Sequence, residues 1–420
     1  MAITDGLNSS SEVTPRLKGL GKGQTAILGF AESFSSPEVA WSLVDAGFRV
    51  LAFARRDSRA ALRVSRYATV FDVTPPEQDA ATTIRELTAE FRRLFASTDS
   101  RAVLLPLDDA ALWVCAQLKP DPQLAIVGPD NADVALKKDV QISVARDAGF
   151  RVPETLVVRS KHQLTSRPFD FPVILKPALA ISFRDGRLVK GRFHICYNAS
   201  EFKSALQGFM DDEPFLIQQY ISGIGEGLFG LAERDGVSNW SSHRRIRMMN
   251  PLGSGASACV SVAAESGDIT AGARFIEQIG WRGPFMLEML RDDEGKKWFM
   301  EFNGRVWGST ALARRCGLEY PAWAVLGALD QDRTVPQKAK VPLGVVCRHA
   351  GREVLHGLFV LRGPRSKNQI KWPPRWDTLK QLLKIRRSER WYNWRRDDWR
   401  GFTRDIVATI AEVVCKKTLS

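Results

Sequence analysis

The sequence lacks the features that mark a membrane-spanning, secreted or zinc-binding protein. No apolar run in its 420 residues approaches the roughly 18–20 residues that a membrane-spanning helix needs. The polar stretch 1–24 has no apolar segment of the kind that a secretory signal requires. The six cysteines are scattered without a Cys-x-x-Cys pair, which argues against a zinc site and against a disulfide framework. We therefore expect a cytoplasmic protein with reduced thiols and no membrane insertion.

Two motifs of common enzyme classes are also missing. The turn that begins at Gly29 reads Gly-Phe-Ala-Glu-Ser-Phe-Ser-Ser and does not contain Gly-x-Gly-x-x-Gly, so a dinucleotide site is not expected there. No Gly-x-Ser-x-Gly turn or paired Cys/His signature occurs, and we therefore expect chemistry without a protein nucleophile.

Positive charge is concentrated at the C-terminal end of the chain. The formal net charge is +13, and the last 56 residues hold 15 Lys and Arg against 6 Asp and Glu, with five of the twelve tryptophans. Such a segment suits an anionic partner, or it packs onto the body through its tryptophans while its charges are solvated. Asp397 and Asp398 interrupt the arginines, which disfavours nucleic acid. We expect the tail to pack against the preceding part of the chain, with its outer arginines solvated.

Strands and helices alternate along the first third of the chain. Apolar runs at 25–29, 48–53, 102–105 and 125–127 have the length of buried strands, with helical stretches between them. This alternation predicts parallel βαβ units in a small, doubly wound α/β sheet. We divide the chain into a flexible leader, a Rossmann-like domain, a second domain and a basic, Trp-rich C-terminal extension, with ranges 1–22, 23–129, 130–335 and 336–420.

A hairpin in the second domain sets two carboxylates opposite one another. A turn centred on Glu294-Gly295 pairs Glu288 with Glu301 and places Asn303 on the same face. Like charges at opposed positions destabilise a ladder unless a cation or a shared proton resolves the repulsion. Two carboxylates and an amide oxygen are hard ligands that suit Mg²⁺. The alternatives are a solvent-exposed face, or a one-residue slip that separates the carboxylates.

Cationic side chains occur at positions that would serve a phosphate. Lys138 precedes an amphipathic helix, Lys176 closes the apolar strand Val173-Ile-Leu-Lys, and Arg305 follows Asn303 by two residues. A lysine that closes a buried strand is rarely unpaired, and a phosphate oxygen is a natural partner. Solvated ends of a strand and a helix remain the alternative for each lysine.

Several blocks of the second domain occur in an order that resembles one known superfamily. They are Lys138 with Gly149 and Pro153, Pro172-Val-Ile-Leu-Lys-Pro177, Ile217-Gln-Gln-Tyr-Ile-Ser-Gly223, Gly253-Ser-Gly-Ala-Ser257 and Glu301-Phe-Asn-Gly-Arg305. The ordered set resembles the ATP-grasp superfamily, in its branch of carboxylate–amine ligases and carbamoyl-phosphate-synthase-like proteins. The resemblance implies a Rossmann-like pre-ATP-grasp domain followed by a two-lobed, α+β ATP-grasp domain.

The resemblance also implies a role for each matching position. The phosphates of ATP would meet Lys138 and Lys176. Adenine would meet the linker residues Gln218, Gln219 and Ile221, and the ribose would meet Glu226. Magnesium, with Mn²⁺ as an alternative, would bind Glu288, Glu301 and Asn303. Arg305 would hold the transferred phosphoryl group. Where relatives often have a glycine-rich flap, residues 178–186 contain a single glycine, so Ser182 or Arg184 would have to replace backbone donors.

The implied reaction activates a small carboxylate as an acyl phosphate and joins it to a small amine, with release of ADP and phosphate. In a strand, Arg245 and Arg247 would face one way and Arg244 the other, so the first two are the expected clamp on the substrate carboxylate. Carboxylation or carbamoyl phosphate formation on the same fold is an alternative, and an ATP-binding regulatory module without ligase activity is another. The oligomeric state is open, with a homodimer as one option.

Overall fold

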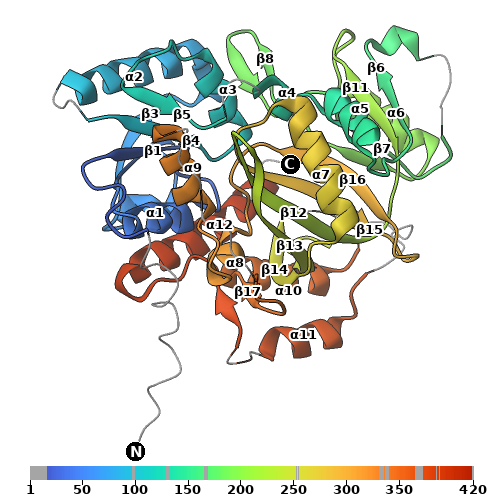
Figure 1. Ribbon diagram of the computed structural model, residues 1–420. Helices are drawn as coiled ribbons and strands as arrows, with labels where there is room; N and C mark the ends of the chain where they lie inside the picture. Colours follow the sequence, from blue (N-terminus) through green and yellow to red (C-terminus); the bar gives the residue numbers. More distant parts are fainter. Residues whose placement is uncertain are drawn as a thin grey trace, which may run out of the picture.

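The computed structural model describes residues 17–96, 100–128, 132–164, 169–251, 253, 255–330, 335, 340–364, 372–384, 386 and 388–418 (Figure 1). Of the expected leader, residues 1–16 lie outside these ranges. Residues 17–23 form turns that lie against the first domain, where the Gly21 amide donates to the Ala46 carbonyl at 2.9 Å.

The N-terminal unit is a five-stranded parallel sheet with the order β3-β2-β1-β4-β5. Its elements are β1 (Thr25–Gly29), α1 (Ser36–Asp45), β2 (Arg49–Arg55), η1 (Ala61–Val64), β3 (Thr69–Val73), α2 (Pro76–Ala96), β4 (Ala102–Pro106), α3 (Asp109–Gln117) and β5 (Leu124–Ile126). The doubly wound α/β prediction is confirmed, although β3 was not expected. Parallel pairing brings the carboxyl ends of β1, β2 and β4 to one edge, where ligands of such sheets bind.

A smaller lobe follows, built on an antiparallel sheet with the order β10-β7-β11-β6. It contains α4 (Ala132–Leu136), α5 (Lys138–Ala148), β6 (Thr155–Val158), η3 (Lys161–Gln163), β7 (Val173–Pro177), the hairpin β8 (Ser182–Arg184) and β9 (Arg187–Val189), β10 (His194–Cys196), α6 (Ala199–Gln207) and β11 (Phe215–Gln219). Gly149 ends α5 with a positive φ of 102°, as expected of a glycine C-cap. Asn198 caps α6 by accepting from the Glu201 amide at 2.9 Å.

The larger lobe is a seven-stranded sheet with the order β16-β15-β12-β13-β14-β17-β18. Its elements are β12 (Ile224–Glu233), β13 (Gly236–Met248), β14 (Ala256–Val262), α7 (Ser266–Ile279), β15 (Gly283–Arg291), β16 (Lys297–Asn303), α8 (Thr310–Arg315), α9 (Tyr320–Leu329), β17 (Val346–Arg348), α10 (Ala350–Arg362), α11 (Arg375–Leu383), β18 (Arg390–Trp391), η4 (Arg396–Asp398) and α12 (Trp399–Thr418). The side chains of α7 pack with Leu228, Leu287 and Phe302 on one face of this sheet. On the opposite face Phe229 belongs to the core that the larger lobe shares with the N-terminal unit.

The basic C-terminal extension is part of this architecture. Strands β17 and β18 complete the large sheet, and the following residues reach the N-terminal unit. The Asp398 carboxylate accepts from Trp41 Nε1 at 2.9 Å and from Ser65 Oγ at 2.6 Å, and Arg395 pairs with Asp45 at 2.9 Å. Packing of the tail onto the body is therefore confirmed, but much of it involves the N-terminal unit. Of the two aspartates that interrupt the arginine run, Asp398 makes the first two of these contacts, and Asp397 accepts a hydrogen bond from the Tyr67 hydroxyl.

Five cysteines in the described chain are buried free thiols. Within the same ranges no helix combines the length and the apolar character needed to cross a membrane.

Candidate functional site

The hairpin of β15 and β16 has the predicted register at the two carboxylates and Asn303. Glu288 pairs with Glu301, and Met286 pairs with Asn303. Nearer the turn a bulge shifts the pairing by one residue, so that Met289 faces Phe299. The bulge lies beyond the two carboxylates, and Glu288, Glu301 and Asn303 therefore share one face of the sheet.

Each of these three side chains already has a cationic partner. Glu288 Oε1 accepts from Arg245 Nη2 at 2.6 Å, and Glu301 Oε1 lies 3.4 Å from Lys138 Nζ. Asn303 Oδ1 accepts from Arg305 Nη2 at 2.8 Å. Positive side chains thus balance the two like charges that the strand register brings together.

Lys176 joins this cluster from the smaller lobe. Its side chain is on β7 and only 8% exposed. No described carboxylate forms an ion pair with it. Burial lowers the pKa of Lys176 to about 8, the nearby Lys138 adds to the effect, and Glu301 and Glu288 oppose it. A buried ammonium without a paired anion is energetically costly, and an anion that binds beside it would remove that cost.

The N-terminal unit contributes an aspartate that the sequence did not indicate. Asp109, in the first turn of α3, accepts from Arg305 Nε at 2.7 Å and lies 3.1 Å from Lys190 Nζ. Although burial opposes it, these two cations hold the pKa of Asp109 well below its usual value. Asp108 caps α3 by accepting from the Ala111 amide and also pairs with Arg55. The carboxyl end of the parallel sheet therefore meets the hairpin cluster through Arg305.

The expected nucleotide linker follows β11. Gln218 is fully buried, and its amide nitrogen donates to Thr155 Oγ1 at 2.8 Å. Its Oε1 is a buried acceptor without a hydrogen-bond donor among the described residues. Since Gln218 pairs with Ile174 and Leu216 pairs with Lys176, Gln218 and Lys176 share one face of the smaller sheet. The backbone N–H of Gln219 donates to the Glu154 carbonyl at 2.9 Å, and Ile221 lies between β11 and β12.

The structure does not bring Glu226 to this cluster. Glu226 pairs with Met289 and faces away from Glu288, toward α7. Its side chain is 1% exposed and forms ion pairs with Arg244, Arg291 and Lys297. Burial opposes ionisation, but the hydrogen bonds from Arg291 and Arg244 lower the pKa of Glu226. A buried, fully paired carboxylate behind the sheet is a structural group, so a ribose contact at Glu226 is not supported.

The two arginines of the expected clamp point to opposite faces. A bulge between Arg245 and Arg247 pairs the first with Cys259 and the second with Ala258, so the two-residue period fails there. Arg247 donates to Glu353 on α10, at 2.7 Å for Nη2. Of the two arginines, only Arg245 reaches the face that Glu288, Glu301 and Asn303 share.

A second arginine near Arg245 was missed by the sequence interpretation. Arg352, in α10, stacks on Phe34 with its Cζ 3.5 Å from the ring centroid and donates to the Ala256 carbonyl at 3.1 Å. Its Nε is buried without an acceptor among the described residues. Burial lowers the pKa of Arg352, against the influence of Asp405, Tyr392 and Glu412.

Several solved structures are similar to this chain. The L-amino acid ligase from Bacillus licheniformis is 13% identical and has a TM-score of 0.54 over 77% of this chain and 78% of its own. Biotin carboxylase from Campylobacter jejuni is 15% identical and has a TM-score of 0.56 over 77% of this chain and 74% of its own. N5-carboxyaminoimidazole synthetase from Staphylococcus aureus, solved with ADP, is 12% identical and has a TM-score of 0.54 over 77% of this chain and 82% of its own. No family model and no curated protein sequence matches.

The chain has the ATP-grasp fold. The cluster described above joins the two ATP-grasp lobes, because Lys138 and Lys176 come from the smaller lobe and the hairpin from the larger one. Among the described residues no group of three His, Cys, Asp or Glu side chains forms a metal site. The candidate set fits magnesium instead through two carboxylates and an amide, completed by ligand oxygens.

The segment at the place of the ATP-grasp flap is anchored to the N-terminal unit. Strands β8 and β9 form a hairpin whose Phe183 stacks on Trp113 of α3, with ring centroids 5.4 Å apart. Ser182 is buried, and Arg184 pairs with Glu213. Arg184 is therefore engaged on the smaller lobe and does not join the cluster.

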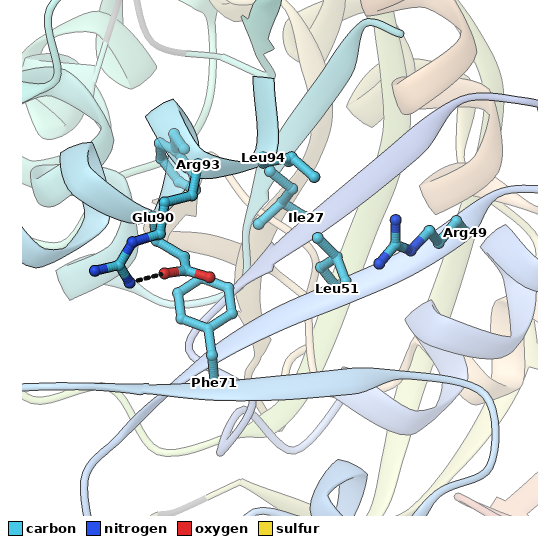
Figure 2. Close-up of a pocket in the computed structure, with 8 residues that line it drawn as sticks. Ile27, Arg49, Leu51, Phe71, Glu90, Arg93 and Leu94 are labelled. Carbon is cyan, nitrogen blue, oxygen red and sulfur yellow. Dashed lines mark hydrogen bonds and ion pairs between the residues drawn. The ribbon is translucent and has the colours of Figure 1, made fainter. Parts of the chain in front are cut away.

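A separate pocket of about 220 Å³ lies in the N-terminal unit, between the sheet and the end of α2 (Figure 2). Ile27, Leu51 and Phe71 line it from the strands, and Glu90 and Arg93 line it from the helix. None of the residues that line this pocket belongs to the hairpin cluster.

Proposed function

We propose that this protein is an ATP-dependent ligase that activates a carboxylate and joins it to an amine. The observation that carries the proposal is the pairing of Glu288 with Glu301, with Asn303 on the same face and the unpaired Lys176 beside them. A cluster of this composition neutralises and orients a triphosphate and its metal. An ATP-binding module that only regulates a partner would not need Arg305 beside the metal ligands.

The nucleotide's parts follow from the donor and acceptor chemistry of the cluster. Lys176 and Lys138 offer ammonium donors to phosphate oxygens. Gln218 Oε1, a buried acceptor without a donor, suits the exocyclic amine of adenine. Glu288, Glu301 and Asn303 would hold Mg²⁺, which withdraws negative charge from phosphate oxygens when bound.

The reaction then needs no protein nucleophile. An oxygen of the substrate carboxylate attacks the γ-phosphorus, the bond to the bridging oxygen breaks, and ADP leaves. The amine attacks the carbonyl carbon of the acyl phosphate, phosphate leaves with its electron pair, and the amine loses a proton. Arg305 stabilises the charge on the phosphoryl group, and Asp109 orients the guanidinium through the 2.7 Å hydrogen bond.

Arg245 and Arg352 are the side chains proposed to recognise the substrate carboxylate. Arg245 of β13 pairs with Cys259 of β14, and Arg352 donates to the carbonyl of Ala256, three residues earlier on β14. Both arginines therefore lie beside the first half of β14. The buried Nε of Arg352 gives the free donor that a carboxylate would accept. Replacing Arg352 with methionine should raise KM for the carboxylate substrate at least tenfold and leave the affinity for ATP unchanged. A loss of ATP affinity of the same size would contradict this assignment.

The test is a screen for ADP release by the full chain with ATP and Mg²⁺. Amino acids and other small carboxylates are supplied singly and in pairs with amines, and bicarbonate is included as a separate carboxylate. Glu301→Gln is the control, because it removes one metal ligand and retains the shape of the side chain. ADP release that depends on both substrates and is lost in the control supports the ligase. Release with bicarbonate alone favours the carboxylase alternative, and nucleotide binding without any turnover favours the regulatory module.

A further inference from the structure

Helices α10 and α11 expose six large apolar side chains to solvent. Their exposed fractions run from 42% at Leu379 to 75% at Trp376. We call this set the α10–α11 face; it consists of Val354, Leu358, Leu361, Trp376, Leu379 and Leu383. None of the six is among the buried residues of its helix: α10 buries Leu355, His356 and Val360 among others, and α11 buries only Thr378.

The two helices run antiparallel. A Cβ on Gly357 would lie 3.1 Å from Leu382, and one on Gly363 would lie 3.5 Å from Arg375. A later position on α10 thus lies beside an earlier position on α11, as two helices of opposite direction require. Trp372 Nε1 also donates to the Val360 carbonyl from the connection between them. This pairing fixes how each helix is rotated toward its neighbour.

Both apolar rows consequently point to the same side of the pair. At 100° per residue around the helix axis, the apolar row of α10 is centred roughly 65° beyond Gly357, and the apolar row of α11 roughly 95° beyond Leu382. When two helices run antiparallel, rotations of the same sense away from the line of contact bring both rows to the same side of the pair. The six side chains therefore form one continuous face across two helices, which is unusual for a surface without a partner.

Exposed cations surround this face. They are Arg362, Arg375, Lys380, Lys384 and Arg386, and none of them pairs with a carboxylate within the described ranges. Arg375 and Lys380 lie on either side of the α11 row at helical spacing. The acids of the two helices are Glu353, which is buried against Arg247 and Arg348, and Asp377. Contact between two copies through this face would oppose like charges, so charge complementarity favours an anionic partner.

We propose that the α10–α11 face docks on an anionic lipid surface. The apolar rows would enter the boundary between headgroups and acyl chains, the Trp376 indole would lie at headgroup level, and the lysines and arginines would meet phosphate groups. Neighbouring basic residues contribute to such adsorption within a Debye length, which makes it sensitive to salt. The ligase chemistry proposed above plays no part in this inference.

The test is co-sedimentation of the full chain with vesicles of phosphatidylcholine, with and without phosphatidylserine. The wild-type chain should bind the vesicles that contain phosphatidylserine, and salt should weaken this binding. Trp376→Ser with Leu383→Ser should reduce the binding at least roughly tenfold. Trp399→Ser with Val407→Ser is the matched control, since these side chains are 53% and 58% exposed on α12 outside the face. This control should bind like the wild type.

All variants change exposed side chains and should keep the wild-type melting temperature. Absence of binding to any vesicle overturns the proposal, as does equal loss in both double variants. A dimer that depends on Trp376 and Leu383, detected by sedimentation velocity without lipid, would also overturn it in favour of a second copy. Capture of an acidic protein in place of the vesicles would overturn it in favour of a protein partner.

Discussion

Replacing Lys176 with methionine should stabilise the nucleotide-free protein near neutral pH. Burial lowers the pKa of this lysine from 10.5 to about 8, so between those values the folded protein binds fewer protons than the unfolded chain. Stability therefore rises with pH across that window, and below it the whole penalty applies. The penalty amounts to about 3 kcal/mol at roughly 1.36 kcal/mol per pKa unit. Methionine removes the buried charge, and the difference from wild type should shrink as the pH rises from about 8 to 10.5.

The same substitution should weaken ATP and spare adenosine. A charge-assisted hydrogen bond to phosphate is worth roughly 1.5–3 kcal/mol, which is about 10- to 150-fold in affinity. Titration calorimetry with ATP and with adenosine, at neutral pH and at one pH unit above the pKa of the lysine, separates the contribution of the lysine charge from the rest of the binding free energy. The wild-type affinity for ATP should fall across that interval because a neutral lysine no longer attracts phosphate, and the variant should lack this component. Equal weakening of ATP and adenosine would refute the assignment, and so would identical pH dependence in both proteins.

Four further substitutions test individual contacts in the structure. Glu226→Gln should lower the free energy of unfolding by about 3 kcal/mol, because it leaves buried cations without their carboxylate, and should leave ATP affinity within twofold of wild type by calorimetry. Asp398→Ala should cost about 1–3 kcal/mol through the lost hydrogen bonds to Trp41 and Ser65, and limited proteolysis should then cut the tail faster. Arg247→Met should lower the melting temperature without changing KM for the carboxylate, whereas Arg245→Met should raise that KM. A Glu226→Gln variant that loses ATP binding, an Asp398→Ala tail as resistant as wild type, or an Arg247→Met variant with impaired KM would each contradict the corresponding assignment.

The hairpin could be predicted from the sequence because charge and apolar pattern agree there. Two glutamates in otherwise apolar strands, equidistant from a Gly-containing turn, leave few registers open, and the bulge falls beyond Glu288. The α/β class of the N-terminal unit followed from the alternation of strands and helices, whereas the two-lobed second domain was expected from the resemblance.

The failures have identifiable physical causes. The period of two assigned Arg247 to the wrong face because a bulge inserts one residue, and a bulge has no clear signal in a single strand. The ribose role of Glu226 rests on the resemblance alone, and its ion pairs with Arg291 and Lys297 join strands whose pairing a single sequence does not reveal. Asp109 was missed because an aspartate at the start of a helix is ordinarily a capping or first-turn residue.

Transfer of oxygen from the carboxylate to phosphate tests the central claim most directly. The substrate carboxylate found in the ADP-release screen is labelled with ¹⁸O, and the released phosphate is analysed by mass spectrometry. Attack on the γ-phosphorus predicts one labelled oxygen in each phosphate released, with no ADP or labelled phosphate from Glu301→Gln. Phosphate without label, while ADP and the amide product still form, would contradict activation of the carboxylate as an acyl phosphate.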